Sequence, residues 1–335
     1  MIDIRSAFEE DQPRPLDELD LAIVHALQID ARAPWTRVAA AVGADSATVT
    51  RRFEQMRDER LAWLTCWPKA AQWESSTDLA MAVLEAHADL GAIGALPWVL
   101  SIDETSAGVV ALVASSSGLR GLGARVRELA STAGLGDGSA LRMHVVASVF
   151  AEDSMWRTRA LDARGQRIMA RPAGTEAPSA PRPALVAELA AELAHDPRMS
   201  AARLGSRLGV SEATARRAVE RASLSGRLGL GCDLAVPAAG LRRGAMLWAR
   251  SSQLHTAGSQ ARRLPQSYRV LEIVGPAPLC ISVRATTLTA LPEIERSLGG
   301  EIEIVDRWTV LGTRKRNGHL LDDWGRTQGR VDVQW

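Results

Sequence analysis

The sequence predicts an α+β protein in which one two-part unit occurs twice along the chain. Each unit consists of a winged-helix-like helix-turn-helix followed by a ferredoxin-like βαββαβ domain. Two observations lead to this prediction. A helical stretch that starts near residue 16 returns near residue 182 at a constant offset of 166 residues. Both copies precede the same series of apolar strands and amphipathic helices, as expected for a duplicated unit.

A helix-turn-helix pattern fills residues 16–61. Apolar residues repeat on one face of the first helix, 16–28, and a short second helix follows. Gly43 then suits a tight turn, because glycine adopts the left-handed conformation, and either Asp45 or Ser46 can cap the next helix. In that helix, 46–59, the apolar spacing predicts one buried face and an exposed N-terminal part. The buried positions are Val49, Phe53 and Met56, and the exposed ones are Ala47, Thr48, Thr50, Arg51 and Arg52.

The second copy, 183–228, keeps these features in register without a gap. The offset places Asp196 at the position of Asp30 and Gly209 at the position of Gly43. Ser211 is a good N-cap for the last helix of this copy. One helix-turn-helix pattern alone would fit a plain helical hairpin in an all-α core equally well. Two occurrences, each before the same sheet unit, favour true helix-turn-helix domains.

The rest of each unit predicts four strands and two helices. In the first unit the strands are expected at 79–85, 99–104, 109–114 and 141–150, with helices at 87–96 and 119–133. In the second unit we expect strands at 245–250, 268–273, 279–283 and 302–311, and the second helix at 291–298. The first three of these strands correspond to 80–85, 98–103 and 109–113 of the first unit. Such a sheet has helices on one face and an apolar opposite face, so each sheet needs a partner.

These elements predict seven segments. They are a polar leader at 1–15 that we expect to be partly disordered, a helix-turn-helix domain at 16–65, a ferredoxin-like domain at 73–152, a tail and linker at 153–182, a second helix-turn-helix domain at 183–230, a second ferredoxin-like domain at 242–314 and a C-terminal tail at 315–335. The linker is expected because 171–183 is rich in proline, alanine and glycine. The glycine-rich segments 118–123 and 226–231 lack the spacing of a nucleotide-binding loop and are interpreted as turns.

Composition excludes several classes of protein. The net charge of +1 argues against a protein that coats nucleic acid without specificity. No apolar run is long enough to span a bilayer and the acidic N-terminus is not a secretory signal, so we expect a cytoplasmic protein with no membrane partner. Cys66, Cys232 and Cys280 lie far apart and indicate buried thiols of a reduced protein. The six histidines show no metal-ligand spacing. We therefore expect no metal site, no cofactor and no catalytic residue, and we expect that the protein is not an enzyme.

The segments LDELDLAIVHALQIDAR and RVAAAVGADSATVTRRFEQMRDERLA resemble the N-terminal domain of the Lrp/AsnC family of transcriptional regulators. The matching features are the opening at 16–20, Asp-Ala-Arg at 30–32 and the threonine and arginine positions at 48–52. The βαββαβ unit resembles that family's effector-binding and oligomerisation domain, the RAM domain. The tandem arrangement is similar to double-unit members found in high-GC bacteria, and GPAPL at 275–279 is similar to a glycine loop of their second units.

The resemblance implies a regulator that binds a double-stranded DNA operator. In single-unit relatives two chains supply the two sheets, so this chain would pair its own two sheets as an intrachain pseudo-dimer and associate further into a homo-oligomer. An operator would then carry two half-sites about 34–36 Å apart, or a multiple of that. The predicted DNA contacts are Thr48, Thr50, Arg51 and Arg52 in the first copy and Ser211, Thr214, Arg216 and Arg217 in the second.

The two copies are not equivalent DNA readers. Residues 16–65 hold eight acidic and six basic side chains, whereas 183–230 hold five acidic and seven basic ones. Because phosphate contacts supply most of the affinity that does not depend on sequence, the second copy is expected to anchor the protein. The different helix sequences predict dissimilar half-sites. The basic cluster 314–316 is either a further phosphate contact or a solvated tail.

The same resemblance implies a small-molecule effector, an amino acid or another metabolite, bound by loops between adjacent strands. The candidate contacts are Ser106 and Gly108 in the first unit and Gly275 and Ala277 in the second. Family members often carry glycine followed shortly by aspartate there, and neither loop has that aspartate. An α-ammonium group would lack an obvious partner, so the effector is expected to be less polar or absent from one half.

Two other functions remain open. Siroheme decarboxylases resemble the same pairing of helix-turn-helix and ferredoxin-like domains and would need histidine and arginine around a tetrapyrrole. His144 and His255 are the candidates in this sequence. The third possibility is an assembly protein that has lost DNA binding. The arginine pairs on the two final helices favour DNA.

Overall fold

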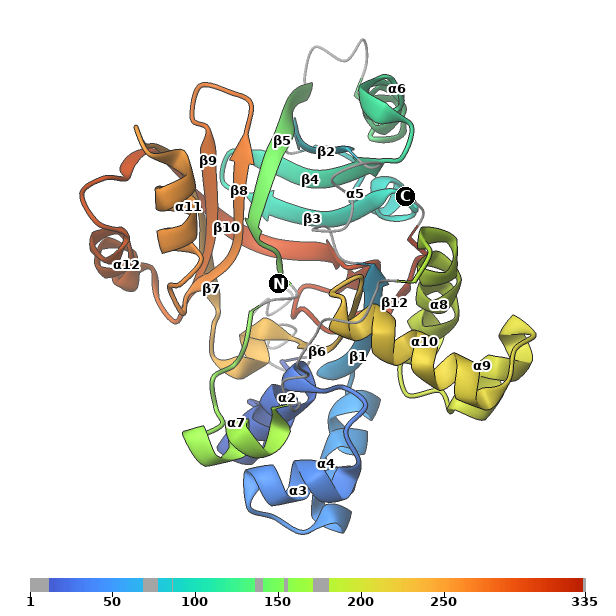
Figure 1. Cartoon of the computed structure of the whole chain (residues 1–335). Coiled ribbons are helices and arrows are strands. Elements are labelled where there is room, and N and C mark those ends of the chain that lie inside the picture. Colours follow the sequence, from blue (N-terminus) through green and yellow to red (C-terminus); the bar gives the residue numbers. More distant parts are fainter. Residues whose placement is uncertain are drawn as a thin grey trace, which may run out of the picture.

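The computed structural model describes residues 12–68, 78–85, 87–135, 141–153, 156–170 and 181–333. Most of the expected leader and linker, at 1–11 and 171–180, therefore lie outside the described residues. In the described parts, two helix-turn-helix domains lie on one side of two β-sheets, and the helices of each sheet unit lie on the outside of the pair (Figure 1).

The first helix-turn-helix has the predicted three helices. They are α2 (Glu18–Ile29), α3 (Trp35–Val42) and α4 (Ser46–Asp58). Gly43 ends α3 with a φ of 73°, and the Asp45 carboxylate accepts a hydrogen bond from the Thr48 backbone amide to cap α4. The buried face predicted for α4 is confirmed, since its three apolar residues lie in the core of this domain.

The second helix-turn-helix repeats this geometry. It consists of α8 (Pro183–His195), α9 (Ala201–Leu208) and α10 (Glu212–Leu224). Gly209 ends α9 with a φ of 66°, and the Ser211 hydroxyl caps α10 by accepting from the Thr214 backbone amide. The same turn chemistry at equivalent positions gives the same helical hairpin twice.

Each helix-turn-helix is followed by a strand, and these two strands pair. β1 (Ala62–Pro68) runs antiparallel to β6 (Leu228–Leu234). The interpretation of 226–231 as a turn is therefore wrong, because Gly229 and Gly231 lie within β6. The Trp67 side chain occupies the space beside them, and a Cβ on Gly229 would lie 2.2 Å from its ring.

The paired strands join the cores of the two helix-turn-helix domains. Cys232 and Leu234 of β6 lie in the core of the first domain, and Cys66 of β1 lies in the core of the second. Each core is thus completed by the strand that follows the other domain. The three cysteine thiols are free and buried, as predicted, and burial raises the pKa of Cys66 to about 12.

The sheet units have ferredoxin-like topology. The first consists of β2 (Asp78–Leu84), α5 (Leu90–Gly94), β3 (Val99–Thr105), β4 (Gly108–Ser115), α6 (Gly118–Thr132) and β5 (Leu141–Ala151). The second consists of β7 (Arg243–Arg250), α11 (Leu254–Ala261), β8 (Ser267–Ile273), β9 (Leu279–Ala285), α12 (Leu291–Leu298) and β10 (Glu303–Arg316). The strand orders β3-β4-β2-β5 and β8-β9-β7-β10 match each other, so the predicted fold class is confirmed. The glycine-rich segment 118–123 belongs to helix α6 and is not a turn.

The two sheets join at both edges. β5 pairs with β8 and β10 pairs with β3, so eight strands form a closed ring. The space between the sheets is filled by apolar side chains that include Met81, Val110, Trp248 and Leu271. The apolar face of each sheet is thereby buried against the other sheet of the same chain.

A shared β-bulge fixes which residues of the two units are equivalent. Leu100 is the extra residue in β3, because its neighbours pair with the consecutive residues 113 and 112 of β4. Tyr268 is the extra residue in β8, because its neighbours pair with residues 283 and 282 of β9. Leu100 and Tyr268 therefore occupy the same position. The predicted alignment of Trp98 with Tyr268 is wrong by two residues, because the apolar pattern of a strand does not reveal an extra residue in it.

The segment predicted as a tail and linker, 153–182, contains the helix α7 (Ala163–Met169). Asp162 caps this helix by accepting from the Gly165 backbone amide, and Leu161 and Met169 lie in the core of the first helix-turn-helix. The backbone amide of Leu161 donates to Nδ1 of His25 on α2. This part of the chain therefore belongs to the first helix-turn-helix domain.

Gly165→Ala is expected to lower the free energy of unfolding by about 1–3 kcal/mol. The added Cβ would lie 2.6 Å from the carbonyl oxygen of Ala41 on α3. Gly123→Ala is the matched control, because the nearest atom there is Nη1 of Arg127 at 3.7 Å. The control is expected to be neutral or stabilising by up to about 1 kcal/mol. Urea unfolding of the full chain measures both, and equal effects would contradict the docking of α7 on α3.

The predicted C-terminal tail is also part of the folded protein. It contributes the last residues of β10 and the short strands β11 (His319–Leu321) and β12 (Thr327–Arg330). Lys315 is fully buried and donates to the carbonyl oxygens of Gly94 and Leu96, and burial lowers its pKa to about 8. Arg316 is buried beside Asp233. Neither side chain is a solvated tail residue or available to a phosphate.

Candidate functional site

The N-terminal part of α4 presents the predicted contacts of the first copy unequally. Arg51 is exposed, and Thr48 is half-buried. The Thr50 hydroxyl donates to the carbonyl oxygen of Ser46. Arg52 lies 2.8 Å from the Asp17 carboxylate and 3.3 Å from the Asp20 carboxylate. Arg52 is thus already engaged within the domain, and Arg51 is the more available cation.

The N-terminal part of α10 is more open. Ser211, Thr214, Arg216 and Arg217 are all exposed. The Ser211 and Thr214 hydroxyls lie 2.9 Å apart, and Arg216 forms an ion pair with Glu212 one turn earlier. An exposed ion pair of this kind is weak and can be exchanged for a phosphate contact.

Equivalent arginines hold the two helix-turn-helix domains together. Arg32 donates to the carbonyl oxygens of Pro197 and Met199, and Arg198 donates to those of Ala31 and Ala33. Because the two arginines occupy the same position in the two copies, the contact is reciprocal. A groove of about 570 Å³ lies beside it, with Arg37 and Arg216 among its lining residues.

The four residues predicted to bind an effector lie at two separate hairpins. Ser106 and Gly108 form the turn between β3 and β4, and the Ser106 hydroxyl accepts from the backbone amide of Thr309 on β10. Gly275 and Ala277 lie in the turn between β8 and β9. Ala277 lines a pocket of about 170 Å³, and a Cβ on Gly275 would lie 2.8 Å from the imidazole of His144.

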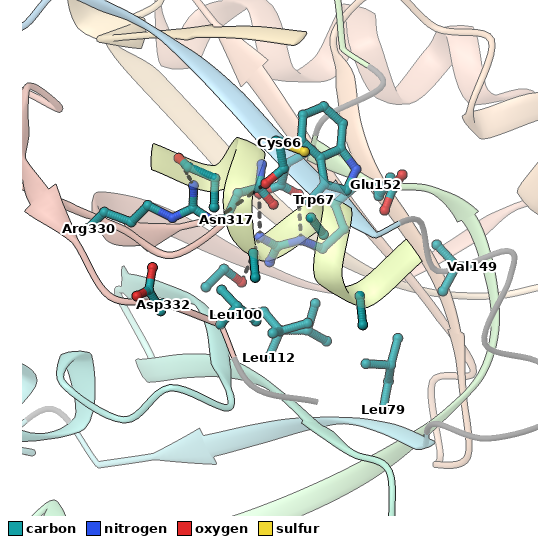
Figure 2. Close-up of a pocket in the computed structure, with 18 of the residues that line it drawn as sticks. Cys66, Trp67, Leu79, Leu100, Leu112, Val149, Glu152, Asn317, Arg330 and Asp332 are labelled. Carbon is teal, nitrogen blue, oxygen red and sulfur yellow. Dashed lines mark hydrogen bonds and ion pairs between the residues drawn. The ribbon is translucent and has the colours of Figure 1, made fainter. Parts of the chain in front are cut away.

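A larger cavity lies between the sheet pair and helix α8, as Figure 2 shows. Its volume is about 350 Å³. Apolar side chains of the sheet strands form one wall, and small side chains of α8 form the other. The first wall includes Leu79, Leu100, Leu112, Val149 and Leu271, and the second consists of Ala187, Ala190, Ala191 and Ala194. We call this space the apolar cavity.

The lining of the apolar cavity also includes a few polar groups. The indole Nε1 of Trp67 is buried without a hydrogen-bond partner. Arg330 donates to the carbonyl oxygens of Ala194 and Cys66, which attaches the C-terminal segment to α8 and β1. A mainly apolar lining with a few polar groups is typical of a small-molecule site.

Arg269 on the lining of this cavity belongs to a buried ion-pair cluster. Its guanidinium lies 2.9 Å from Asp103 and 2.7 Å from Asp153, and it donates to the Ser101 hydroxyl. Burial alone would lower the pKa of Arg269, but Asp153 and Asp103 raise it well above its ordinary value. Burial would likewise raise the pKa of Asp153, yet Arg269 lowers it. Arg269 and Asp153 are therefore both charged.

Two further kinds of feature are absent from the described residues. No helix in this part of the chain is long and apolar enough to cross a membrane. No group of three or more histidine, cysteine, aspartate or glutamate side chains is placed there to hold a metal ion.

Comparison with family models decides the nature of the first helical domain. The model of the AsnC-type helix-turn-helix domain matches residues 16–57. This chain carries an AsnC-type helix-turn-helix domain. No curated protein sequence matches the chain.

Solved structures show how far the fold extends beyond the AsnC-type domain. The siroheme decarboxylase NirDL is 12% identical, and the alignment covers 90% of this chain and 93% of that one with a TM-score of 0.53. NirDL in complex with an iron-uroporphyrin III analogue gives the same identity and coverage with a TM-score of 0.51. AsnC of E. coli is 19% identical over 39% of this chain and 93% of its own, with a TM-score of 0.35. At 12% identity, the NirDL likeness shows a shared tandem fold.

The buried charges are the functional candidates that the sequence analysis missed. Arg269 and Arg284 stand in strands whose other residues are mostly apolar, and this interruption was the available signal. It was overlooked because an isolated arginine in a strand usually indicates an exposed position.

Proposed function

We propose that this protein is a sequence-specific regulator that binds double-stranded DNA through both helix-turn-helix domains. The match of residues 16–57 to the AsnC-type domain carries the proposal. The second copy supports it, because α10 presents Arg217 and Thr214 unobstructed at its N-terminal part. One chain would act as a covalent pseudo-dimer, since β1 pairs with β6 and the two sheets close on each other.

The test is selection of bound sequences from random duplex DNA by the full chain, followed by gel shifts over a range of salt concentrations. We expect a bound site with two dissimilar half-sites. Affinity should fall steeply with salt, because each neutralised phosphate releases counterions. A failure to enrich any sequence, with no gel shift at low salt, would overturn the proposal in favour of an assembly protein.

Arg217→Ala and Arg51→Ala are each expected to weaken operator binding about tenfold and to reduce the salt slope by about one. Arg217→Ala should have the larger effect, because the second copy carries the excess of basic residues. Arg120→Ala is the matched control, since Arg120 is an exposed arginine on α6, away from both recognition helices. Equal losses for all three variants would show that only the net charge matters.

A small-molecule effector is part of this proposal, and the apolar cavity is its best site. The lining of leucine, valine and alanine agrees with the expectation of an effector less polar than an amino acid. A thermal-shift screen of apolar metabolites tests this part. Ala191→Trp, which would place an indole in the cavity, should abolish any shift that a ligand produces.

A second candidate function is decarboxylation of siroheme. The observation that favours it is the fold shared with NirDL over 90% of this chain. Of the two candidate histidines, His144 lines the small pocket near Trp248, whereas His255 packs against Phe150. Absorption spectroscopy with an iron uroporphyrin decides the matter. A stoichiometric shift of the porphyrin band that His144→Ala removes would favour the enzyme, and an unchanged spectrum would favour the regulator.

A further inference from the structure

A second cavity, of about 380 Å³, lies between the second sheet unit and the connector that follows β6. Residues of the 3₁₀ turn η3 (Val236–Ala239) and the turn before β12 form one side. Four arginines line this space, namely Arg242, Arg243, Arg284 and Arg316. We call it the arginine cavity.

Two buried polar side chains of the arginine cavity lack partners. Arg284 is 9% exposed, its Nε has no hydrogen-bond partner, and the described residues offer its guanidinium no ion pair. Its Cζ lies 4.0 Å from the centre of the Tyr268 ring. Tyr268 is 2% exposed, and its hydroxyl is also without a partner. Buried donors of this kind are normally hydrogen-bonded, so an acceptor is missing here.

Two other charged side chains of this cavity already have ion-pair partners, although the Nε of Arg316 also lacks a hydrogen bond. Arg316 is paired with Asp233 and donates to the carbonyl oxygen of Leu234, and Asp323 is held by Arg314. The two aspartates that pair with Arg269 partly offset the positive charge of Arg284. Neither of them forms an ion pair with Arg284 itself. Burial lowers the pKa of Arg284, as expected for a cation without a direct counter-ion.

Comparison of the two units shows that the fold does not require these polar residues. Val113 and Val283 are equivalent at the shared bulge, so the next residues, Ala114 and Arg284, are equivalent too. Their pairing partners on the neighbouring strands are Leu79 and Gly244. The shared bulge makes Leu100 equivalent to Tyr268. In the first unit these positions are apolar, and Leu79 and Leu100 line the apolar cavity.

The same change occurs on the last strands. The shared bulge makes Asp103 on β3 equivalent to Leu271 on β8. Val149 pairs with Leu271 and Thr313 pairs with Asp103, so Thr313 occupies the position equivalent to Val149. Val149 lines the apolar cavity and Thr313 lines the arginine cavity. The two cavities are therefore counterparts that the duplication has made chemically different.

We propose that the arginine cavity binds a small anion, through a carboxylate or phosphate group that accepts hydrogen bonds from Arg284 and Tyr268. Guanidinium groups match both anions in geometry and charge. Arg243 is exposed at the same cavity and adds positive charge for an anion that enters from solvent. The site is separate from the apolar cavity and does not depend on the proposed DNA binding.

The single tyrosine of the chain gives a direct test. Full-length protein labelled with 3-fluorotyrosine has one ¹⁹F resonance, and it reports on Tyr268. Inorganic phosphate and succinate are titrated separately at constant ionic strength, with sodium chloride as the reference. We expect a saturable shift of the resonance with at least one of the two anions. The anion that produces it distinguishes a phosphate ligand from a carboxylate ligand.

Arg284→Ala should weaken this binding at least tenfold, whereas Arg120→Ala should leave it unchanged. Tyr268→Leu, followed by the thermal shift with the same anions, should also reduce binding. Both cavity variants carry residues that the first unit already has at these positions, so we expect them to fold. No resonance shift with either anion, or equal binding by Arg284→Ala and wild-type protein, would overturn the proposal.

Discussion

Arg269→Met is expected to lower the free energy of unfolding by about 3–5 kcal/mol. The substitution keeps most of the side-chain volume but leaves the carboxylates of Asp103 and Asp153 unpaired. Their side chains are 0% and 8% exposed, so water cannot replace the guanidinium. Breaking a buried pair from one side is costly for this reason, and urea unfolding of the full chain measures the loss.

Two further variants isolate the cause. Asp103→Leu reproduces Leu271, its equivalent in the second unit. Asp153→Asn reproduces Asn317, because Ala151 and Lys315 pair with equivalent residues and the two positions lie two residues further on. Combined with Arg269→Met, they should recover most of the loss, because replacing a whole buried cluster is often neutral. Arg307→Ala removes an ion pair whose arginine is 53% exposed, and its cost should stay below about 1 kcal/mol. If Arg269→Met costs no more than Arg307→Ala, the cluster is not stabilising in this way.

Stability is expected to fall between about pH 7.5 and about pH 5 by about 2 kcal/mol for each of His25 and His319. Burial, followed by nearby arginines, lowers the pKa of His25 to about 4 and that of His319 to about 3, from an ordinary value of 6.5. In this range the unfolded chain binds protons that the folded protein does not. The stabilisation is therefore complete above pH 6.5 and is lost as the pH falls towards the folded pKa values.

The variants His25→Asn and His319→Asn test this pH dependence. Asparagine does not titrate, and its carbonyl oxygen can accept a hydrogen bond where Nδ1 of His25 accepts from Leu161. The double variant should show a flatter dependence of the melting temperature on pH. His87→Asn is the control, because it makes the same substitution at an exposed position. A profile equally steep in the double variant would refute the assignment.

The helices and most strands could be predicted because their signals are local. The spacing of Val49, Phe53 and Met56 and the turn chemistry of Gly43 and Gly209 determine the helical hairpins within a few residues. The repeat added an independent check, since the same pattern occurs at a constant offset. The errors fell where local rules mislead. Gly229 and Gly231 suggested a turn, yet they lie in β6 because Trp67 leaves no room for a side chain.

The candidate sites divide in the same way. The exposed face of α10 follows from helix periodicity, and Arg217 is exposed as the sequence predicted. Nothing local indicates that Lys315 is fully buried or that Arg269 lies between two carboxylates. Their partners are more than 100 residues away in the sequence, so only the closed chain brings them together.

The sequence by itself determined the order of the elements, the duplicated unit, the helix-turn-helix class and the apolar face that α4 buries. These properties depend on contacts within a few residues or on comparison of one copy with the other. The tertiary structure alone decided that β1 pairs with β6, that the sheets close into one ring, and that the two equivalent cavities differ. The physical reason is that strand pairing and the burial of charge depend on contacts between residues far apart in the sequence. Local sequence patterns do not indicate which distant residues come into contact.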